Sequence, residues 1–236
     1  MLIEPKQEQT TILTRVVVGS RLHGLATETS DWDLRGVHIH TLKDVLSPFK
    51  TLKNTTWMEG DTDNTSYELA DFCKQATHGN ATILEVFFSN QIETTTLIAD
   101  EMRANWHKFI DTDKFVMASK GYAHNQLTKM ELFESVPESS GDRSAKFAVA
   151  YCRVMWQCAE FLRTGIFKCQ IEEPLKSFLF EVKTNWSKKH IPELTHQFTH
   201  LQQDVATEWE KAEKMKPDID WIEDFIVRSY SVNPTI

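Results

Sequence analysis

The 236-residue sequence lacks the features of several protein classes. No apolar run approaches the roughly 18 residues that a membrane-spanning helix needs, and the segment MLIEPKQEQTT has no basic stretch followed by an apolar one. We therefore expect a cytoplasmic protein with no membrane partner. A formal net charge of -8 argues against a strongly basic protein that coats nucleic acid. Because there is also no internal repeat or low-complexity tract, partner choice must come from a local site.

The sequence also lacks the paired cysteine spacing that is typical of metal or redox sites. It has four cysteines, at positions 73, 152, 158 and 169, and none forms a C-x-x-C pair. A chain of this length can bury a sizeable core without disulfides or metal staples. We expect the four thiols to be buried as small hydrophobic groups.

The apolar pattern changes along the chain. Residues 12–18 and 33–39 are typical of strands joined by a turn or short helix, and residues 54–63 give a weaker third strand. A helix is predicted from Ser66, capped by Ser66 or Thr65 and stopped at Gly79-Asn80. Beyond it, helical spacing covers residues 97–109, 111–132, 144–164, 172–188 and 191–215, with a linker-like loop at 135–144.

Two aspartates lie one residue apart near the start of the second predicted strand. Residues i and i+2 of a strand point to the same face, so Asp31 and Asp33 would hold their carboxylates side by side. Two anions so placed repel each other unless a cation lies between them, and oxygen ligands of this kind suit Mg²⁺ or Mn²⁺ bound together with substrate phosphates. The pair therefore predicts a divalent metal site.

A glycine–serine turn precedes the pair. Gly19 and Ser20 end the first apolar run, where backbone N–H groups and a hydroxyl can approach a phosphate closely. An isolated D-x-D is commonly a solvated turn or a helix cap, and a lone G-S carries less information still. Their combination in one strand-turn-strand unit, with Ser30 directly before Asp31, favours phosphoryl or nucleotidyl transfer.

These residues carry a resemblance to a known family. The segment GSRLHGLATETSDWDLRGV resembles the glycine–serine and S-D-x-D signature of the DNA polymerase β nucleotidyltransferase superfamily, closest to stand-alone nucleotidyltransferases associated with RNA repair in bacteria and phages. The segments YELADFCKQATHGNATILEVFFSN, KGYAHNQLTKM and AKFAVAYCRVMWQCAEFLRTGIF are similar to later parts of that family. Ala81 departs from the pattern, since the family has a proline after Asn80.

The resemblance implies an α+β fold, with a polymerase-β-like nucleotidyltransferase sheet and helices in residues 1–95 and an all-helical region in residues 96–236. It implies that Gly19 and Ser20 hold the β- and γ-phosphates of a nucleoside triphosphate, with Ser30 among the nucleotide-binding residues. It also implies that Asp31 and Asp33 ligate Mg²⁺ or Mn²⁺.

The superfamily uses a third carboxylate, on a neighbouring strand, to polarise or deprotonate the attacking hydroxyl. The candidates here are Asp63, at the end of the predicted third strand, and Glu68, at the start of the helix. We favour Asp63 as metal ligand and catalytic group, because a strand-borne side chain can face the pair whereas Glu68 more readily charges a first helical turn. Glu59 and Asp61 share the strand parity of Asp63 if that strand is continuous.

Basic residues supply further candidates. Arg21 and Arg35 flank the motif and could contact phosphate or lie in surface ion pairs. Lys146 and Arg153 are seven residues apart on one helix face and could bind triphosphate or an acceptor nucleic acid, although a solvated basic face is the common outcome. Glu85 precedes an apolar run, so we expect it to have a partner, with Arg35 as the candidate.

The sequence thus predicts a metal-dependent nucleotidyltransferase that transfers a nucleoside monophosphate to an acceptor hydroxyl of RNA, tRNA or another nucleic acid and releases pyrophosphate. One alternative is a toxin-like enzyme that modifies a protein or tRNA. The other is a catalytically silent nucleotide-binding regulatory module. The second alternative leaves unexplained why the unfavourable pair of Asp31 and Asp33 is kept.

Overall fold

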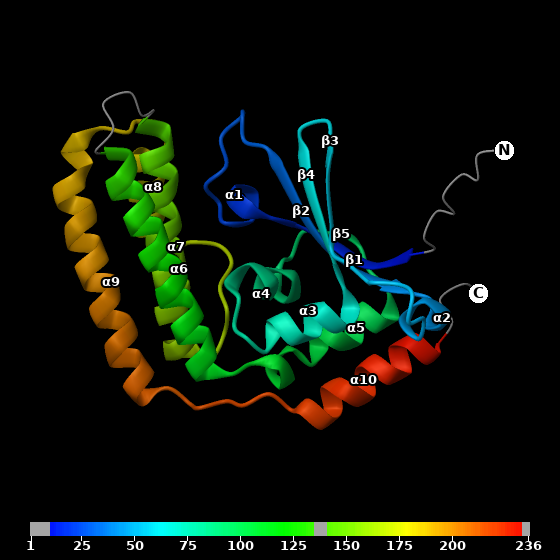
Figure 1. Cartoon of the computed structure of the whole chain (residues 1–236). Coiled ribbons are helices and arrows are strands. Elements are labelled where there is room, and N and C mark those ends of the chain that lie inside the picture. Colours follow the sequence, from blue (N-terminus) through cyan, green and yellow to red (C-terminus); the bar gives the residue numbers. More distant parts are fainter. Residues whose placement is uncertain (1–9, 135–140, 233–236) are drawn as a thin grey trace.

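The structure, a computed structural model, describes residues 10–134 and 141–232 and has a mixed α+β fold (Figure 1). A five-stranded sheet is followed by a mainly helical region. The strands are β1 (Thr10–Val18), β2 (Trp32–His40), β3 (Thr55–Glu59), β4 (Thr62–Glu68) and β5 (Ile92–Thr94), in the order β3-β4-β2-β1-β5. Strands β2 and β4 run parallel, and the other neighbours run antiparallel. The α+β fold class is confirmed.

The first two predicted strands are confirmed as β1 and β2, but the third prediction is wrong. Residues 54–63 do not form one strand, because the chain reverses at Gly60, where φ is +60°. Two antiparallel strands, β3 and β4, result. The parity that grouped Glu59 and Asp61 with Asp63 therefore fails, since Glu59 lies on β3 and Asp61 lies in the turn.

The start of the first long helix also differs from the prediction. Helix α3 begins at Leu69 and ends at Ala76, and its cap is Glu68, whose Oε2 accepts hydrogen bonds from two backbone amides of the first turn. Ser66 remains in β4, where its hydroxyl pairs with Nδ1 of His38 at 2.8 Å. The Ser66 hydroxyl therefore bonds His38 on the neighbouring strand and does not cap the helix, the role that its position in the sequence had favoured.

The remaining elements follow the predicted helical run with few exceptions. They are α1 (Gly19–Leu22), α2 (Leu42–Val45), α4 (Ala81–Phe88), α5 (Leu97–Ala104), η1 (Trp106–Phe109), α6 (Thr112–Glu134), α7 (Gly141–Thr164), α8 (Leu175–Thr184), η2 (Lys188–His190), α9 (Ile191–Lys211) and α10 (Ile219–Ser231). The helix predicted at 97–109 is divided into α5 and η1, and α2, α4, β5 and α10 were not predicted. Of the loop predicted at 135–144, residues 135–140 lie outside the described residues and the rest begin α7.

The helices form two groups around the sheet. Helices α6, α7, α8 and α9 make a bundle beside it, while α3, α4 and α5 lie under one sheet face and α10 runs beneath them (Figure 1). Helix α10 thus returns from the bundle to the first part of the chain. There Arg228 pairs with Glu101 of α5, and the Tyr230 hydroxyl donates to Glu68. The division at residue 95 stays a prediction. Helices α5 and α10, which follow that residue in the chain, both pack with the sheet side.

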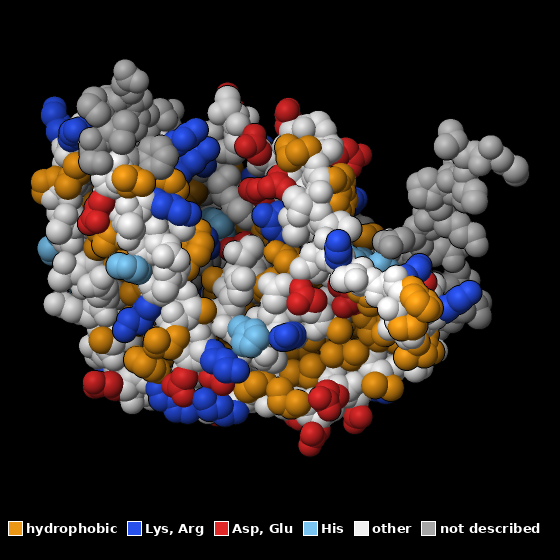
Figure 2. Space-filling view, in the orientation of Figure 1, with side chains coloured by type: hydrophobic (Ala, Val, Ile, Leu, Met, Phe, Trp, Pro, Cys, Tyr) orange, Lys and Arg blue, Asp and Glu red, His pale blue; other side chains and the backbone are white. Residues whose placement is uncertain are grey.

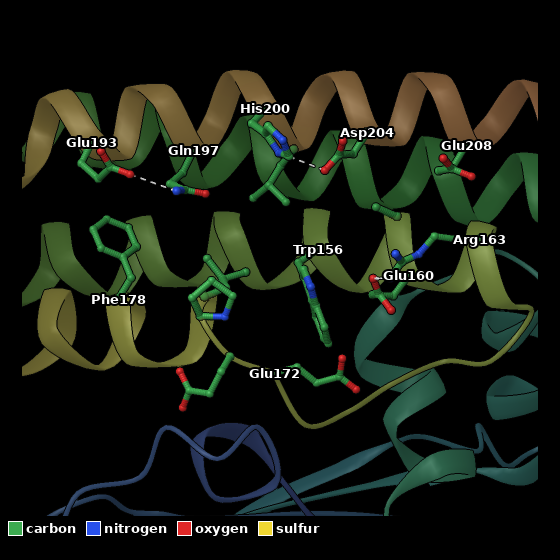
Figure 3. Close-up of a pocket in the computed structure, with 15 residues that line it drawn as sticks. Trp156, Glu160, Arg163, Glu172, Phe178, Glu193, Gln197, His200, Asp204 and Glu208 are labelled. Atoms are coloured by element: carbon green, nitrogen blue, oxygen red, sulfur yellow. Dashed lines mark hydrogen bonds and ion pairs between the residues drawn. The ribbon is translucent and has the colours of Figure 1, made fainter.

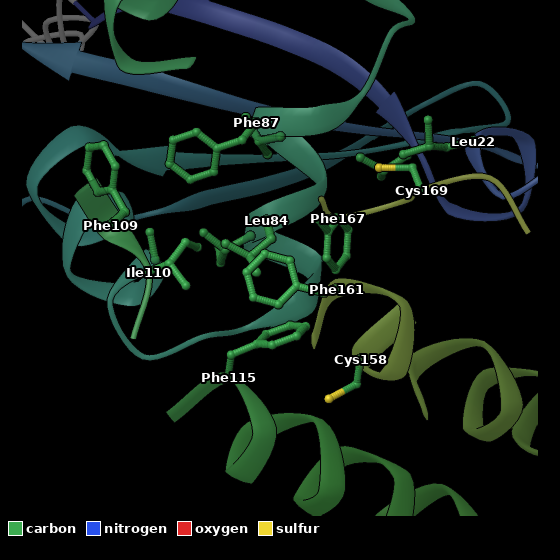
Figure 4. Packing of buried hydrophobic residues seen from close by; sticks show 14 of the residues in the cluster. Leu22, Leu84, Phe87, Phe109, Ile110, Phe115, Cys158, Phe161, Phe167 and Cys169 are labelled. Carbon is green, nitrogen blue, oxygen red and sulfur yellow. The ribbon is translucent and has the colours of Figure 1, made fainter. Parts of the chain in front are cut away.

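An aromatic cluster joins the bundle to the sheet side (Figure 4). The ring of Phe115 on α6 lies 5.0 Å from that of Phe161 on α7, and Phe167 lies 5.5 Å from Phe88 on α4. Each such buried side chain contributes roughly 1.5–3 kcal/mol of hydrophobic stabilisation. The continuous core therefore holds the bundle against α4, which positions the two walls of the site described below.

The four cysteines are buried and unpaired, as predicted for small hydrophobic groups. Burial raises the pKa of the Cys158 thiol to about 12, so it carries little thiolate at neutral pH. Among the described residues, no helix combines the length and the apolar character that crossing a membrane requires.

Candidate active site

Three aspartates gather at one end of the central strands. Asp33 of β2 lies directly beside Asp63 of the parallel strand β4, and Asp31 immediately precedes β2. Burial raises the pKa of Asp33, the charge of Arg35 opposes that rise, and the charges of Asp63 and Asp31 add to it. The carboxylates therefore repel one another in the absence of a cation.

The glycine–serine turn presses against Asp33. Val18, the last residue of β1, pairs with Asp33, and Gly19 then adopts a φ of +67°. A Cβ on residue 19 would collide with the Asp33 carboxylate, lying 2.8 Å from its Cγ. Both the positive φ and the close approach require glycine at this position. The turn and the aspartate thus form one rigid unit.

A cavity of about 460 Å³ opens in front of this unit. Its sheet side carries Asp31 and Asp33, and its bundle side carries Lys146 of α7 and Lys183 of α8. The residues that line it are Ser20, His23, Leu25, Thr27, Thr29, Ser30, Asp31, Asp33, Lys146, Val149, Ala150, Arg153 and Lys183. Figure 2 shows the hollow, with Lys and Arg side chains along its bundle side and Asp and Glu side chains along its sheet side. Such an arrangement can hold a cation on one wall and a polyanion on the other.

Lys183 is a site residue that the sequence analysis missed. Its Nζ donates to the backbone oxygen of Leu25 at 2.7 Å and to Oγ of Ser30 at 3.3 Å. Burial lowers the pKa of Lys183, and the charge of Lys146 lowers it further, while Asp33 opposes both. No local pattern marks this lysine, because Ser30 lies 153 residues earlier in the chain.

Arg21 lies outside the cavity lining. Its Nη2 donates to the backbone oxygen of Ser30 at 2.6 Å, and its Nε donates to that of Asp31 at 3.3 Å. The guanidinium also stacks 4.0 Å above the centre of the Trp32 ring, which is 43% exposed. In this structure Arg21 holds the loop that precedes the carboxylates.

Arg153 lines the cavity, but its guanidinium group is hydrogen-bonded to buried side chains behind the cavity wall. Its Nη1 donates to Glu85 Oε1 at 3.0 Å and to Gln157 Oε1 at 2.9 Å. The Nε2 atom of His23 lies 2.8 Å from the same Glu85 oxygen. The partners of Glu85 are thus Arg153 and His23, and the expected pairing with Arg35 is wrong. Sequence spacing gave no sign of these contacts, which join α4 to α7 and to the residue that follows α1.

Glu68 lies far from the other candidate carboxylates. It follows Asp63 by five residues on β4, which is about 16 Å along an extended strand. Its oxygens cap α3 and accept from the Tyr230 hydroxyl, and burial raises the pKa of Glu68. The structure therefore brings Asp63, and not Glu68, to the pair of Asp31 and Asp33.

The donor chemistry of the three aspartates fits a divalent cation. Carboxylate oxygens suit Mg²⁺ or Mn²⁺, and Mg²⁺ is commonly held by one or two carboxylates together with substrate phosphates. Among the described residues, no three His, Cys, Asp or Glu side chains form a ready-made metal cage. The site thus fits a cation that is shared with a bound phosphate chain.

A larger cavity, of about 720 Å³, lies between α7, α8 and α9 (Figure 3). Its acidic lining consists of Glu160, Glu172, Glu173, Glu193, Asp204 and Glu208. Glu160 is paired there with Arg163 and Lys168, and His200 lies 3.0 Å from Asp204. None of the three candidate aspartates lines this cavity, and its negative lining disfavours phosphate. The smaller cavity is therefore the candidate active site.

The comparison with protein families identifies the family of the chain. Residues 3–228 match the model of the RNA repair pathway DNA polymerase beta family, so the chain belongs to that family. No curated protein matches the chain.

Proposed function

We propose that this member of the RNA repair pathway DNA polymerase beta family is a metal-dependent nucleotidyltransferase. It transfers a nucleoside monophosphate from a nucleoside triphosphate to an acceptor hydroxyl and releases pyrophosphate. The observation that carries the proposal is the alignment of Asp33 with Asp63 beside the Gly19 turn, facing basic residues across the cavity. A chain with no cation or phosphate to bind gains nothing from such mutually repelling carboxylates.

Each wall of the cavity has a distinct part in the proposed reaction. Asp31, Asp33 and Asp63 would hold Mg²⁺ or Mn²⁺, which neutralises phosphate charge when bound. The Ser20 hydroxyl borders the cavity on the same side and can donate to a phosphate oxygen. Lys146, on the opposite wall, adds positive charge where the triphosphate lies.

Asp63 has a further part in the proposal. It lies beside Asp33 on the neighbouring strand, where its carboxylate can orient the acceptor hydroxyl and accept the proton that leaves it. The hydroxyl oxygen then attacks the α-phosphorus, and the bond from that phosphorus to the bridging oxygen of pyrophosphate breaks. Positioning and charge neutralisation supply most of the rate enhancement.

The proposed acceptor is RNA or tRNA. Its support is the family description together with lysines along the bundle side of the cavity, which offer a local basic surface on a chain of net charge -8. Modification of a protein remains the alternative acceptor class.

Transfer of label tests the proposal. The purified protein is incubated with Mg²⁺ or Mn²⁺, each α-³²P-labelled nucleoside triphosphate, and total cellular RNA and protein. We expect label on RNA, reduced about 1000-fold by Asp31→Asn with Asp33→Asn, since a bound metal supplies several kcal/mol of charge stabilisation. Glu59→Gln with Asp61→Asn also removes two carboxylate charges, from the exposed β3–β4 hairpin, and is the matched control that should keep transfer.

Other outcomes would change the assignment. Label on protein alone would favour the toxin-like alternative. Nucleotide binding without label on any macromolecule would favour the regulatory module. Undiminished labelling by the double variant would remove Asp31 and Asp33 from the mechanism.

A further inference from the structure

A buried polar circuit lies behind the cavity and joins four segments of the chain. Glu85 of α4 is 2% exposed. Its Oε1 is hydrogen-bonded both to His23, at the end of the α1 turn, and to Arg153 of α7. Arg153 also donates to Gln157, whose Nε2 donates to the backbone oxygens of Lys168 and Cys169 at 3.1 and 3.3 Å.

The circuit closes on the turn itself. The amide of Ile171 donates to the backbone oxygen of His23 at 3.2 Å. The backbone amide of Gly19 is among the groups that lower the pKa of the Glu85 carboxylate. Glu85 therefore binds the short segment from Gly19 to His23 at its His23 end, and the His23 amide bonds the Gly19 oxygen at 3.0 Å to close that segment. Arg153 joins Glu85 to the bundle.

The charges in this circuit favour an ionised carboxylate. Burial on its own raises the pKa of Glu85, but His23, Arg153 and the Gly19 amide together hold it below its ordinary value. Burial and the Arg153 charge lower the pKa of His23, so its ring is neutral at neutral pH and its Nε2–H donates to Glu85. Arg153 thus supplies the permanent countercharge.

We infer that Glu85 is a positioning residue, which fixes the Gly19–Ser20 turn in the conformation that receives the nucleotide phosphates and ties that conformation to the placement of α7. Helix α7 carries Lys146, so one buried carboxylate sets the separation of the two walls. What the turn binds rests on the proposed function, whereas the rigidity of the turn does not.

Hydrogen exchange measures that rigidity without any nucleotide. The amides of His23, Gly24 and Leu25 bond backbone oxygens within the turn, at Gly19, Arg21 and Ser20 respectively, and so report on its opening. Glu85→Gln leaves one acceptor oxygen where two were present. We expect exchange in residues 19–25 to become at least about 10-fold faster, while β1 and β2 change by less than about 3-fold.

Two further variants separate positioning from general stability. Glu160→Gln is the matched control, because Glu160 is also a buried, ion-paired glutamate of the same fold but does not touch the turn. The double variant Glu85→Gln/Arg153→Met removes the guanidinium that Glu85→Gln leaves without a countercharge. We expect it to recover much of the melting temperature lost by Glu85→Gln and to keep the fast exchange of residues 19–25.

The inference is overturned if Glu85→Gln speeds exchange equally in all segments, if Glu160→Gln opens the turn as strongly, or if the double variant restores slow exchange in the turn. With labelled nucleoside triphosphate, Glu85→Gln should raise KM at least about 10-fold, and Glu160→Gln should not. Absence of transfer by the wild-type protein would refute the proposed function and leave the exchange result to decide the inference.

Discussion

The Asp33 carboxylate lies directly over the α-carbon of Gly19, so close that residue 19 has no room for a Cβ. This contact joins the end of β1 to the start of β2 and places the turn beside a carboxylate that would hold the metal. The cation and the phosphate chain of the proposed substrate would meet across this contact.

Gly19→Ala should therefore lower the unfolding free energy by more than the positive φ alone would cause. Gly60 is the matched control, since its φ of +60° is similar and no atom lies within 4 Å of a Cβ placed there. We expect Gly60→Ala to cost about 1–2 kcal/mol and Gly19→Ala at least about 3 kcal/mol, because the latter must also displace Asp33. Urea unfolding of both variants measures the difference, and equal losses would contradict the close contact.

Asp63 and Glu68 should respond oppositely to removal of their carboxylates. Asp63→Ala should lower nucleotidyl transfer at least about 100-fold with little loss of stability, since Asp63 lies beside Asp33 and its removal relieves the repulsion between the two carboxylates. Glu68→Ala should cost about 1–2 kcal/mol of unfolding free energy through the lost α3 cap, yet leave transfer within about 3-fold. Steady-state kinetics and thermal melts of each variant would expose a reversed assignment.

The two lysines of the bundle side should contribute to nucleotide affinity. Lys146→Met and Lys183→Met should each raise KM for the nucleoside triphosphate about 10-fold or more, because each removes a cavity-lining positive charge that would contact phosphate in the proposed function. The exposed Lys189, which does not line the cavity, provides the control Lys189→Met. An unchanged KM in both cavity variants would move the triphosphate away from this wall.

The buried His23 side chain predicts one contribution to the change of stability with pH. Burial holds the pKa of His23 in the folded protein below the ordinary histidine value of 6.5, so the unfolded chain binds a proton more readily. The contribution of neutral His23 to the unfolding free energy is fully present above about pH 6.5 and is lost as the pH falls below that value. The loss from this one group is at most about 1.4 kcal/mol between about pH 7.5 and 5.5. Urea unfolding at both pH values should show a smaller fall in His23→Gln, whereas His200→Gln, at an exposed site, should behave as the wild type.

The local sequence by itself determined the front of the site. Asp31 and Asp33 are two residues apart, and Gly19 and Ser20 end an apolar run, so both features follow from the period of a strand and from the chemistry of a turn. The helical run after residue 96 followed in the same way from the 3.6-residue spacing of its apolar positions. Lys146 and Arg153, placed on one face by their spacing, do line one cavity.

Only the tertiary structure decided which distant residues complete the site. Asp63 faces Asp33 because a reversal at Gly60 sets the register of β4, and no strand period reveals a two-residue turn inside an apparent strand. The contacts of Lys183 with Ser30 and of Glu85 with Arg153 join segments far apart in the chain. Such contacts arise when separate helices pack around a common core, and the periodicity of one element carries no information about its neighbour in space.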